Sequence, residues 1–289
     1  MKKSHRDTIF VEQAEIIEQV AYAGEQYVMR VKAPEIASHA KAGSFAHITC
    51  DPMLPMRRPI SIMRVDRDHG WVDFLYKAIG HGTQLLATRQ AGEHLSVMGP
   101  IGNPFRLDLS RPRALLIGGG VGMPPMIFLA ETLKALLGSK PFAILGSEVP
   151  FPFTTRPSTI MVPGMPDGVI AGMPLLEDWN IPSRLTSLQA YAGCFEGYVT
   201  DLARHWLDAL SDEQRNEVMI YSCGPHPMLE AVAKLASEYN LPCQVSLEEF
   251  MACGVGGCAG CVVEVKTDNG PVMKRVCVDG PVFNAEQVF

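Results

Sequence analysis

Four cysteines near the C-terminus form the most specific chemical pattern in the sequence. Their spacing is Cys253-x4-Cys258-x2-Cys261-x15-Cys277. Three thiols in one short loop with a distal fourth are the plant-type ligand arrangement of a [2Fe–2S] cluster. The loop residues 254–260 include four glycines and no charged side chain. Glycines let the backbone fold tightly and aim amide N–H groups at sulfur, so we expect these four cysteines to be iron ligands.

Two other interpretations of the cysteine segment stay open at this point. A structural zinc site usually pairs two short cysteine knuckles, whereas here three candidate ligands share one glycine-rich loop. Plain buried thiols are the other possibility. Eight cysteines in 289 residues are too few for a disulfide scaffold. The four outside the segment are scattered, and most such cysteines are small buried hydrophobes; they are Cys50, Cys194, Cys223 and Cys243.

An iron–sulfur cluster of this kind implies a particular set of partners for its electrons. The cluster takes one electron at a time, whereas a nicotinamide gives two as hydride. A flavin connects the two, because it accepts a hydride and releases single electrons. If the chain binds NAD, we therefore expect a flavin site as well.

The first hundred residues contain candidates for the flavin site. An arginine and a hydroxyl lie three residues apart in a strand-like context, suited to a flavin pyrophosphate and ring edge. A Gly-Thr pair further on opens a short helix, whose free N–H groups can bind an anion. Each motif alone is weak, and Arg-Pro-x-Ser is often a surface turn. The expected flavin-binding residues are Arg58, Pro59, Ile60, Ser61, Leu75, Tyr76, Lys77, Gly82 and Thr83.

Two further motifs predict the nicotinamide site. The glycine-rich stretch 118–125 follows an apolar strand and opens a helix, the context of a dinucleotide-phosphate loop. Residues 223–228 stand at the end of another strand, where open α/β sheets bind ligands. The expected residues are Gly118, Gly120, Gly122, Gly224 and Pro225, with Cys223 as a catalytic thiol beside the nicotinamide. The alternative for this second motif is a tight strand–helix turn with a buried thiol.

Three zones of the chain, which differ in their hydrophobic patterns, must position these motifs. Residues 1–105 show short apolar or alternating runs between turn residues, typical of an antiparallel β-barrel. Residues 106–243 alternate strands with amphipathic helices, typical of a doubly wound parallel sheet. Residues 244–289 form a small cysteine-bearing domain. Expected strands are 27–31, 46–49, 71–76, 94–98, 114–117, 142–145, 218–222 and 262–265. Expected helices are 125–137, 201–210 with Thr200 as N-cap, and 226–239.

Composition excludes several classes of protein. The chain is 47% hydrophobic and 19% charged, with a net charge of −6 and no basic run, so nucleic-acid binding is a poor expectation. The longest uncharged stretch, 114–130, contains four glycines and two prolines and is too short for a membrane span. Residues 1–7 lack the features of a signal peptide. We expect a cytoplasmic protein without a membrane partner.

In their order along the chain, these motifs resemble the ferredoxin–NADP reductase superfamily. The segment around the cysteines is more specific, with 248–252 reading Glu-Glu-Phe-Met-Ala and 276–283 reading Val-Cys-Val-Asp-Gly-Pro-Val-Phe. It resembles the electron-transfer subunits of class 1B dihydroorotate dehydrogenase, and the resemblance covers nearly the whole chain. It is interrupted at 148–182, a stretch with seven prolines, where the family has a compact strand–helix passage near the pyridine nucleotide.

The resemblance implies an FAD-binding β-barrel in 1–105, an NAD-binding α/β domain in 106–243 and a [2Fe–2S] domain in 244–289. It implies an NAD-linked oxidoreductase that passes electrons to or from an FMN-containing catalytic subunit, which oxidises dihydroorotate in pyrimidine biosynthesis. A hetero-oligomer is therefore expected. Two alternatives remain: a reductase subunit for another acceptor, such as ferredoxin or a sulfur compound, and a non-catalytic binding module stabilised by zinc.

Overall fold

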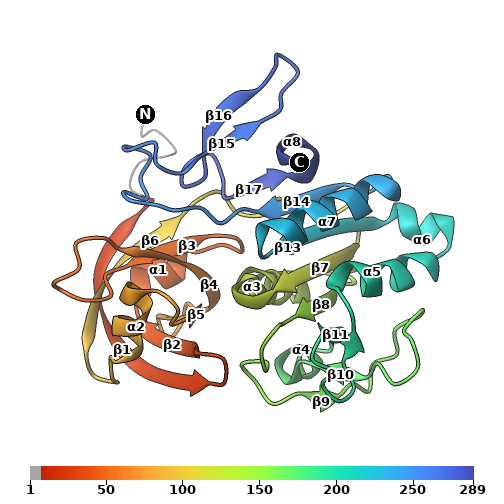
Figure 1. Ribbon diagram of the computed structural model, residues 1–289, viewed down its shortest axis with the longest axis horizontal. Coiled ribbons are helices and arrows are strands. Elements are labelled where there is room, and N and C mark those ends of the chain that lie inside the picture. Colours follow the sequence, from red (N-terminus) through yellow and green to blue (C-terminus); the bar gives the residue numbers. More distant parts are fainter. Residues whose placement is uncertain (1–7) are drawn as a thin grey trace.

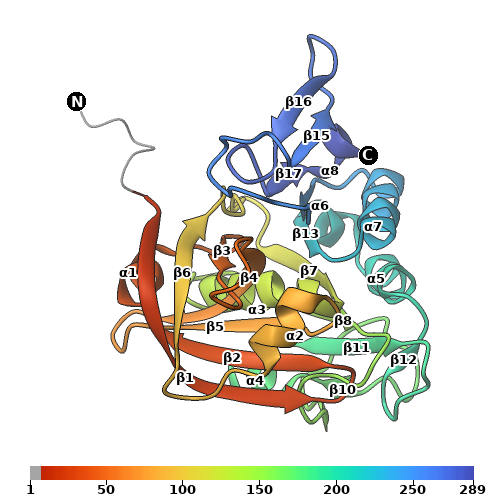
Figure 2. The same cartoon turned by 60° about the vertical axis from the view of Figure 1, so that its left-hand side comes forward.

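The computed structural model describes residues 8–289. The first seven residues, on which the expectation about a signal peptide rests, lie outside the described part. Two bodies lie side by side, a β-barrel and a layered α/β unit, and the cysteine segment lies across one end of both (Figures 1 and 2). Between residues 8 and 289, no helix combines the length and apolar character that a membrane span requires.

The barrel closes through six antiparallel strands, as the alternating runs of the first zone predict. The order around the barrel is β1-β2-β5-β4-β3-β6. Every second residue of β6 is buried, which is the pattern of a strand with one face on a core. The barrel strands are β1 (Phe10–Tyr22), β2 (Gln26–Lys32), β3 (Phe45–Ile48), β4 (Arg58–Asp66), β5 (Trp71–Lys77) and β6 (His94–Ile101). Two short helices cover its ends, α1 (Pro34–His39) and α2 (His81–Ala87).

The second body is built on a seven-stranded sheet with the order β12-β11-β8-β7-β13-β14-β17. All neighbouring strands run parallel except the antiparallel edge strand β17. This confirms the doubly wound α/β architecture. The strands are β7 (Arg113–Gly119), β8 (Phe142–Gly146), β11 (Ser183–Ser187), β12 (Phe195–Glu196), β13 (Val218–Cys223), β14 (Cys243–Ser246) and β17 (Val282–Asn284).

Helices cover both faces of this sheet. Helix α3 lies between the sheet and barrel strand β4, whereas α5 and α7 pack together on the opposite face (Figure 1). The helices are α3 (Met123–Lys134), α5 (Val199–Asp208), α6 (Asp212–Asn216) and α7 (His226–Glu238), with a single 3₁₀ turn, Gly120–Gly122, before α3.

Helices α3 and α5 begin and end two to three residues before their predicted positions. Helix α5 is capped by Tyr198, not by Thr200, because the Asp201 carboxylate accepts from the Tyr198 N–H and begins the helix earlier. Helix α3 ends at Lys134, and Leu137, the last residue of the predicted helix, is fully exposed. Leu133 is buried, so the buried face of the helix ends there and the predicted last turn is wrong.

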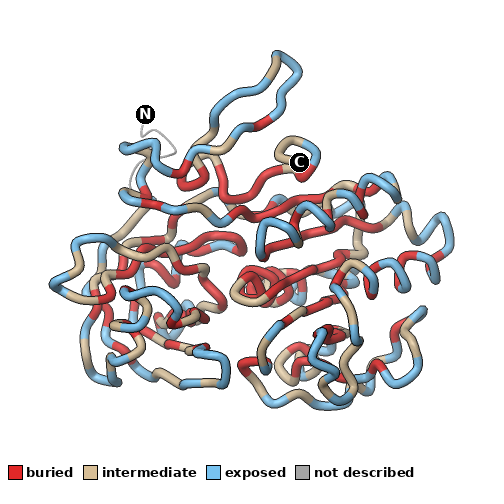
Figure 3. Tube along the Cα trace, viewed as in Figure 1, coloured by how far each residue is buried: buried red, intermediate tan, exposed pale blue. Residues whose placement is uncertain are grey.

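Buried side chains form two hydrophobic cores, one on each face of the parallel sheet. The buried residues lie mainly along the strands of the barrel and of the sheet (Figure 3). One core joins the barrel interior to α3 and to the sheet face that includes Leu116. The other joins the opposite face, including Leu115, to α5, α7 and the cysteine segment, with Cys261 and Cys277 among its members. The alternation of Leu115 and Leu116 between the two cores is the two-residue period of a strand buried on both sides.

The proline-rich stretch 148–182 is an ordered lobe at one edge of the sheet. It contains the short strands β9 (Arg156–Pro157) and β10 (Ala171–Gly172) and helix α4 (Pro174–Asp178). The buried Arg184 guanidinium donates to the carbonyls of Val169, Ser183 and Ile160, replacing the regular ladder that prolines cannot supply.

Charge and aromatic contacts join the barrel to the sheet body. Arg64 of β4 forms an ion pair with Glu131 of α3, with Nη2 and Oε1 3.1 Å apart. The same guanidinium lies near the rings of Trp71 and Trp179, at 5.5 and 5.1 Å from their centroids. Cation–π contacts of this kind stabilise partly desolvated interfaces, so these side chains help to fix the two bodies against each other.

The cysteine segment continues from β14 and returns to the same sheet. After the cysteine loop, the hairpin of β15 (Val262–Val265) and β16 (Val272–Arg275) projects outward, and helix α8 (Ala285–Val288) follows β17. Asn103, just after β6, donates from its backbone N–H to the Gly280 carbonyl at 2.6 Å, and its side-chain amide donates to the carbonyls of Val278 and Asp279. The division into domains at 105/106 and 243/244 stays a prediction, and β14 crosses the second of these boundaries.

Candidate functional site

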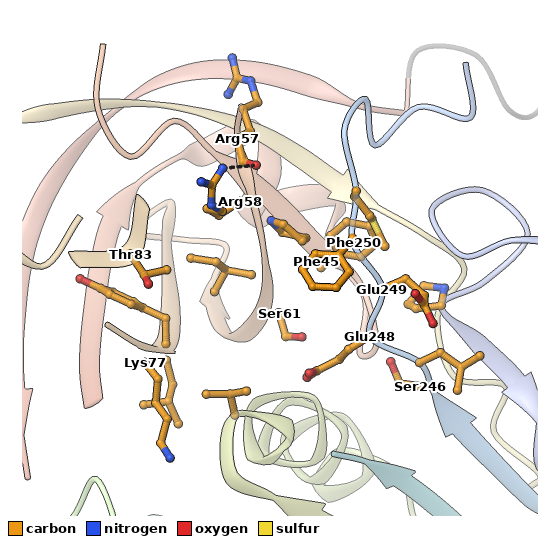
Figure 4. Close-up of a pocket in the computed structure, with 18 of the residues that line it drawn as sticks. Phe45, Arg57, Arg58, Ser61, Lys77, Thr83, Ser246, Glu248, Glu249 and Phe250 are labelled. Carbon is orange, nitrogen blue, oxygen red and sulfur yellow. Dashed lines mark hydrogen bonds between the residues drawn. The ribbon is translucent and has the colours of Figure 1, made fainter. Parts of the chain in front are cut away.

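A cavity of about 910 Å³ lies where the barrel, the sheet and the cysteine segment meet (Figure 4). Its size falls within the roughly 300–1,000 Å³ of small-molecule and cofactor sites. Barrel residues line one side, and the segment 246–252 with Gly260 and Pro281 lines the other.

Eight of the nine predicted flavin-binding residues line this cavity. β4 contributes Arg58 to Ser61, β5 contributes Leu75 to Lys77, and Thr83 enters from α2. Neighbouring antiparallel strands β4 and β5 bring the first two motifs together, although 13 residues lie between Ser61 and Leu75 in the sequence. The roles of these residues in FAD binding stay a prediction.

Gly82 is the ninth predicted residue, and it does not line the cavity. It supports Arg58 instead. A methyl group placed on Gly82 would lie 2.8 Å from Arg58 Nε and 2.9 Å from Nη2. The guanidinium therefore lies directly over the first turn of α2, where a side chain at position 82 would displace it. Arg58 Nη1 donates to the Met56 carbonyl at 2.7 Å, which anchors the group at the cavity wall. This cradle fits a phosphate group.

The neighbouring Arg57 is turned away from that cradle. Its guanidinium donates to the Ser96 carbonyl and to Ser96 Oγ, both at 2.8 Å, and joins β4 to β6. Figure 4 shows the two arginines pointing apart. Tyr76 also uses its polar group structurally, because its hydroxyl donates to Gln19 Oε1 at 2.9 Å.

The two predicted nicotinamide motifs meet at the carboxyl edge of the sheet. Strands β7 and β13 are neighbours, with Gly118 opposite Cys223. A methyl group on Gly122 would lie 2.2 Å from the Cys223 carbonyl oxygen, so only glycine permits this backbone approach. Of the loop, Val121 lines the cavity, whereas Gly118, Gly120, Gly122, Gly224 and Pro225 do not. Their contact with NAD stays a prediction.

Cys223 lies behind the cavity wall and has no exposed surface. Burial, with the nearby Glu248 charge, raises the pKa of its thiol well above the ordinary range. The thiol lies next to Ser246, which lines the cavity. This thiol is therefore protonated at neutral pH, and nothing tests its predicted catalytic role.

Sequence reasoning did not single out three residues that shape the cavity. Phe45 of β3, Glu248 and Phe250 all line it, and Figure 4 places the last two on the strand-to-loop segment opposite the barrel. Glu248 is exposed into the open cavity, and the protein atoms around its carboxyl still desolvate it enough to raise its pKa. No local pattern marks Phe45, whereas Glu248 and Phe250 belong to the stretch that carried the family resemblance.

The four cysteines predicted as iron ligands gather in one loop region as two pairs. Hydrogen-bond contact joins the thiols of Cys253 and Cys258, and likewise those of Cys261 and Cys277. The second pair is buried, and Cys258 is exposed. Among residues 8–289 no three His, Cys, Asp or Glu side chains converge on a single metal-ion position. Two pairs of thiols suit the two irons of a [2Fe–2S] cluster, although their role as ligands stays a prediction.

Backbone amides of the glycine-rich loop already point at sulfur. The N–H groups of Gly257 and Cys258 donate to Cys253 Sγ at 3.3 and 3.4 Å, and Gly260 donates to Cys258 Sγ at 3.4 Å. Partial burial opposes the shift, but the amides of Val255, Cys258 and Gly257, together with the Cys258 thiol, lower the pKa of Cys253 to about 6. Burial and the Cys261 thiol raise the pKa of Cys277 to about 12. The donor set is that of a thiolate site.

Solved structures define the class. The chain is 26% identical to a structure described as an NADH-dependent reduced ferredoxin–NADP oxidoreductase that performs flavin-based electron bifurcation; the match covers 96% of this chain and 90% of that one, with a TM-score of 0.77. The ferredoxin reductase of carbazole 1,9a-dioxygenase shares the fold at 19% identity, with a TM-score of 0.60 over 81% of this chain and 67% of that one. The fold and cavity are those of a ferredoxin–NADP reductase-type oxidoreductase.

Sequence relatives define the family within that class. Residues 248–289 match the family described as the iron-sulfur cluster binding domain of dihydroorotate dehydrogenase B. The electron transfer subunit of dihydroorotate dehydrogenase B (NAD(+)) from Desulforamulus reducens is 32% identical over 95% of this chain and 97% of the relative. The corresponding subunit from Caldanaerobacter subterraneus subsp. tengcongensis is 33% identical over 86% of each. This chain belongs to the family of dihydroorotate dehydrogenase B electron transfer subunits.

Replacing Arg58 by alanine is expected to weaken FAD binding by roughly 1.5–3 kcal/mol, because a charge-assisted contact to phosphate is lost. Gly82→Ala is the matched variant: its methyl group would displace the guanidinium, so FAD binding should fall while Tm of the flavin-free protein stays near the parent value. Equilibrium dialysis measures the FAD affinity of both variants, and thermal unfolding of the flavin-free proteins measures Tm. Unchanged affinity in both variants would make Arg58 a surface-turn residue.

Replacing Glu248 by glutamine is expected to raise Tm at pH 7. Burial raises the folded-state pKa of Glu248, so its contribution to stability is full below the unfolded-state value and is lost as pH rises through the folded-state pKa. The Tm difference should therefore shrink as pH falls towards 4. Thermal unfolding of flavin-free protein across this range checks it, with Glu249→Gln, a neighbour in the same cavity, as control. A Tm difference between Glu248→Gln and the parent protein that does not change with pH would contradict this prediction.

Proposed function

We propose that this chain carries electrons between NAD, an FAD in the barrel cavity and a [2Fe–2S] cluster held by the four cysteines. Bound FAD and cluster supply the conversion between a two-electron hydride and single electrons. The chain's own residues bind these groups, hold them close together and keep solvent from the space between them. Its partner is the FMN-containing catalytic subunit that oxidises dihydroorotate in pyrimidine biosynthesis, with which it forms a hetero-oligomer.

The shared cavity is the observation that carries this proposal. One wall holds the flavin motifs of β4 and β5, and the opposite wall includes Gly260, between two of the cysteines. A group bound along the barrel would therefore reach the cysteine loop without intervening elements. A non-catalytic zinc module would not require a cofactor-sized cavity at this position.

Charged side chains give the cavity two unlike ends. Arg58 and the first turn of α2 form a cationic end suited to the pyrophosphate of FAD. Glu248 and Glu249 line the other end, with Ser61 between the two on β4 (Figure 4). This polarity orients a ligand that has an anionic phosphate part and a neutral ring part. Val121, of the glycine-rich loop that follows β7, also lines the cavity, and this loop is where we place the nicotinamide site.

A second acceptor class has one observation in its favour. The chain covers 90% of the 26% identical structure described as an NADH-dependent reduced ferredoxin–NADP oxidoreductase. A ferredoxin is therefore the alternative acceptor for the same cluster. The family membership favours the dihydroorotate-oxidising subunit, and the experiment below includes both.

Replacing Cys258 by serine is expected to remove the cluster and leave FAD bound, because the cysteine loop and the flavin motifs lie on different elements. The purified variant should still reduce its FAD with NADH in stopped flow. It should lose nearly all electron transfer to the catalytic subunit that co-purifies with the native chain. Iron, sulfide and flavin analysis, followed by assays with dihydroorotate and with ferredoxin, measure each step.

Cys194→Ser is the matched control, since Cys194 lies outside the cysteine loop and is half-buried. It should keep the cluster and both electron-transfer steps. A cluster-free Cys258→Ser protein that still reduced the partner at full speed would refute the relay. Co-purification with a ferredoxin-linked complex, and transfer to ferredoxin only, would select the alternative acceptor.

Replacing Cys223 by serine is expected to slow FAD reduction by NADH while FAD and cluster contents stay unchanged. The proposal places the nicotinamide at the end of β13, where this thiol lies behind Ser246. Stopped-flow absorbance of the flavin measures the rate, with Cys243→Ser, another buried thiol in the adjacent strand β14, as control. Equal hydride rates in the parent and Cys223→Ser proteins would show that Cys223 is only a buried thiol in a tight turn.

A further inference from the structure

His47, on barrel strand β3, is a buried polar side chain that the proposed function does not use. It is completely buried. Neither Nδ1 nor Nε2 has a hydrogen-bond partner within residues 8–289. Buried polar groups in folded proteins are nearly always hydrogen-bonded. The polypeptide alone therefore leaves this imidazole without the acceptor that its N–H requires.

The ring of His47 faces the cysteine loop rather than the flavin cavity. Phe45 and His47 are two residues apart on β3 and share one face of the strand, with ring centroids 5.9 Å apart. Phe45 lines the cavity, and His47 does not. His47 instead packs against Gly254, the residue that follows Cys253.

The side of the imidazole that carries both nitrogens is the part that meets the loop. A methyl group placed on Gly254 would lie 2.9 Å from Cε1, 3.0 Å from Nδ1 and 3.1 Å from Nε2 of His47. These nearly equal distances place the methyl position over the Nδ1–Cε1–Nε2 side of the ring, so both nitrogens lie close to the backbone beside Cys253. Because Gly254 has no side chain, the ring approaches closer than any other residue would allow.

The environment keeps this imidazole neutral. Burial, and then the nearby Arg57 guanidinium, lower the pKa of His47 to about 4. A neutral imidazole carries one N–H donor. Sulfur atoms of an iron–sulfur cluster and its thiolates accept hydrogen bonds, and such bonds help to set the reduction potential. The loop's own amides donate to Cys253 and Cys258, whereas His47 comes from the barrel.

We propose that His47 donates a hydrogen bond from the barrel to the sulfur of the group held by the cysteine loop, and so makes that group easier to reduce. This inference rests on the proposed function, because it takes the four cysteines as ligands of a [2Fe–2S] cluster. Reduction adds negative charge, which an N–H donor stabilises more than it stabilises the oxidised state. His47 is a positioning residue that acts through the cluster and does not touch substrate.

The test compares His47→Leu, which has no donor, with His47→Gln, which keeps one, in the purified complex with its catalytic subunit. Spectroelectrochemical titration gives the reduction potential of the cluster. We expect His47→Leu to lower the equilibrium constant for reduction about tenfold, which is about 59 mV for one electron. His47→Gln should recover much of the difference. His94→Leu, an exposed histidine at the far end of β6, should leave the potential unchanged.

Iron and sulfide analysis of the parent protein separates the two proposals. A parent protein without iron or sulfide would refute the proposed function. A loaded parent protein whose potential equals that of loaded His47→Leu would overturn only the role of His47.

If His47→Leu fails to hold the cluster, pulsed EPR of the reduced parent protein labelled with ¹⁵N-histidine decides the question. A ¹⁵N coupling that disappears in His47→Gln supports the hydrogen bond. Absence of any such coupling in the loaded parent protein overturns it.

Discussion

Three hydrogen bonds from Asn103 hold the cysteine segment against the end of the barrel. The neighbouring Gly102 adds to this contact, because a methyl group there would lie 2.3 Å from Pro281. Pro281 lines the cavity from the side opposite the barrel. The position of the cysteine loop over β3, the closure of the cavity and the approach of His47 to Gly254 therefore all depend on this joint. The second hydrophobic core also spans this junction, since it contains Phe45 and Ile101 of the barrel together with Cys277 of the cysteine segment. The hydrogen bonds of Asn103 add direction to that apolar contact.

Function also depends on how charge is distributed along the cavity. A fixed guanidinium over α2 and two carboxyl groups on the opposite segment create an electrostatic direction that a neutral cavity would lack. Arg57 does not weaken this direction, because its guanidinium is turned into the barrel wall by Ser96. Adjacent arginines thus have different surroundings, because Arg57 joins β4 to β6 whereas the Arg58 guanidinium lies over α2 at the cavity, where its role in binding stays a prediction.

The sequence predicts best those features that depend on neighbours in the chain. The cysteine spacing, the alternation in β6 and the loop before α3 are local, and the fold class follows from such patterns. Arg58 and Gly82 are 24 positions apart in the sequence, and only the folded chain brings them into contact. The sequence could therefore single out each residue but could not predict that one packs against the other. Phe45 and His47 carry no local signal, since their roles come from which strand face meets the cysteine segment. The cap of α5 was missed because Thr200 is a good capping residue, whereas the helix begins earlier, after Tyr198, with Asp201 as the N3 residue whose carboxylate accepts from the Tyr198 N–H.

The edge strand β17 has a consequence for how the chain could be divided. It lies after all four cysteines in the sequence, yet it pairs with β14 at the edge of the sheet. The segment between these two strands, which contains all four cysteines, is therefore an insertion held at both ends by one sheet. Deleting the chain after Ser246 would remove β17 together with the cysteines and expose the edge of β14, so a cut there does not separate two independent units.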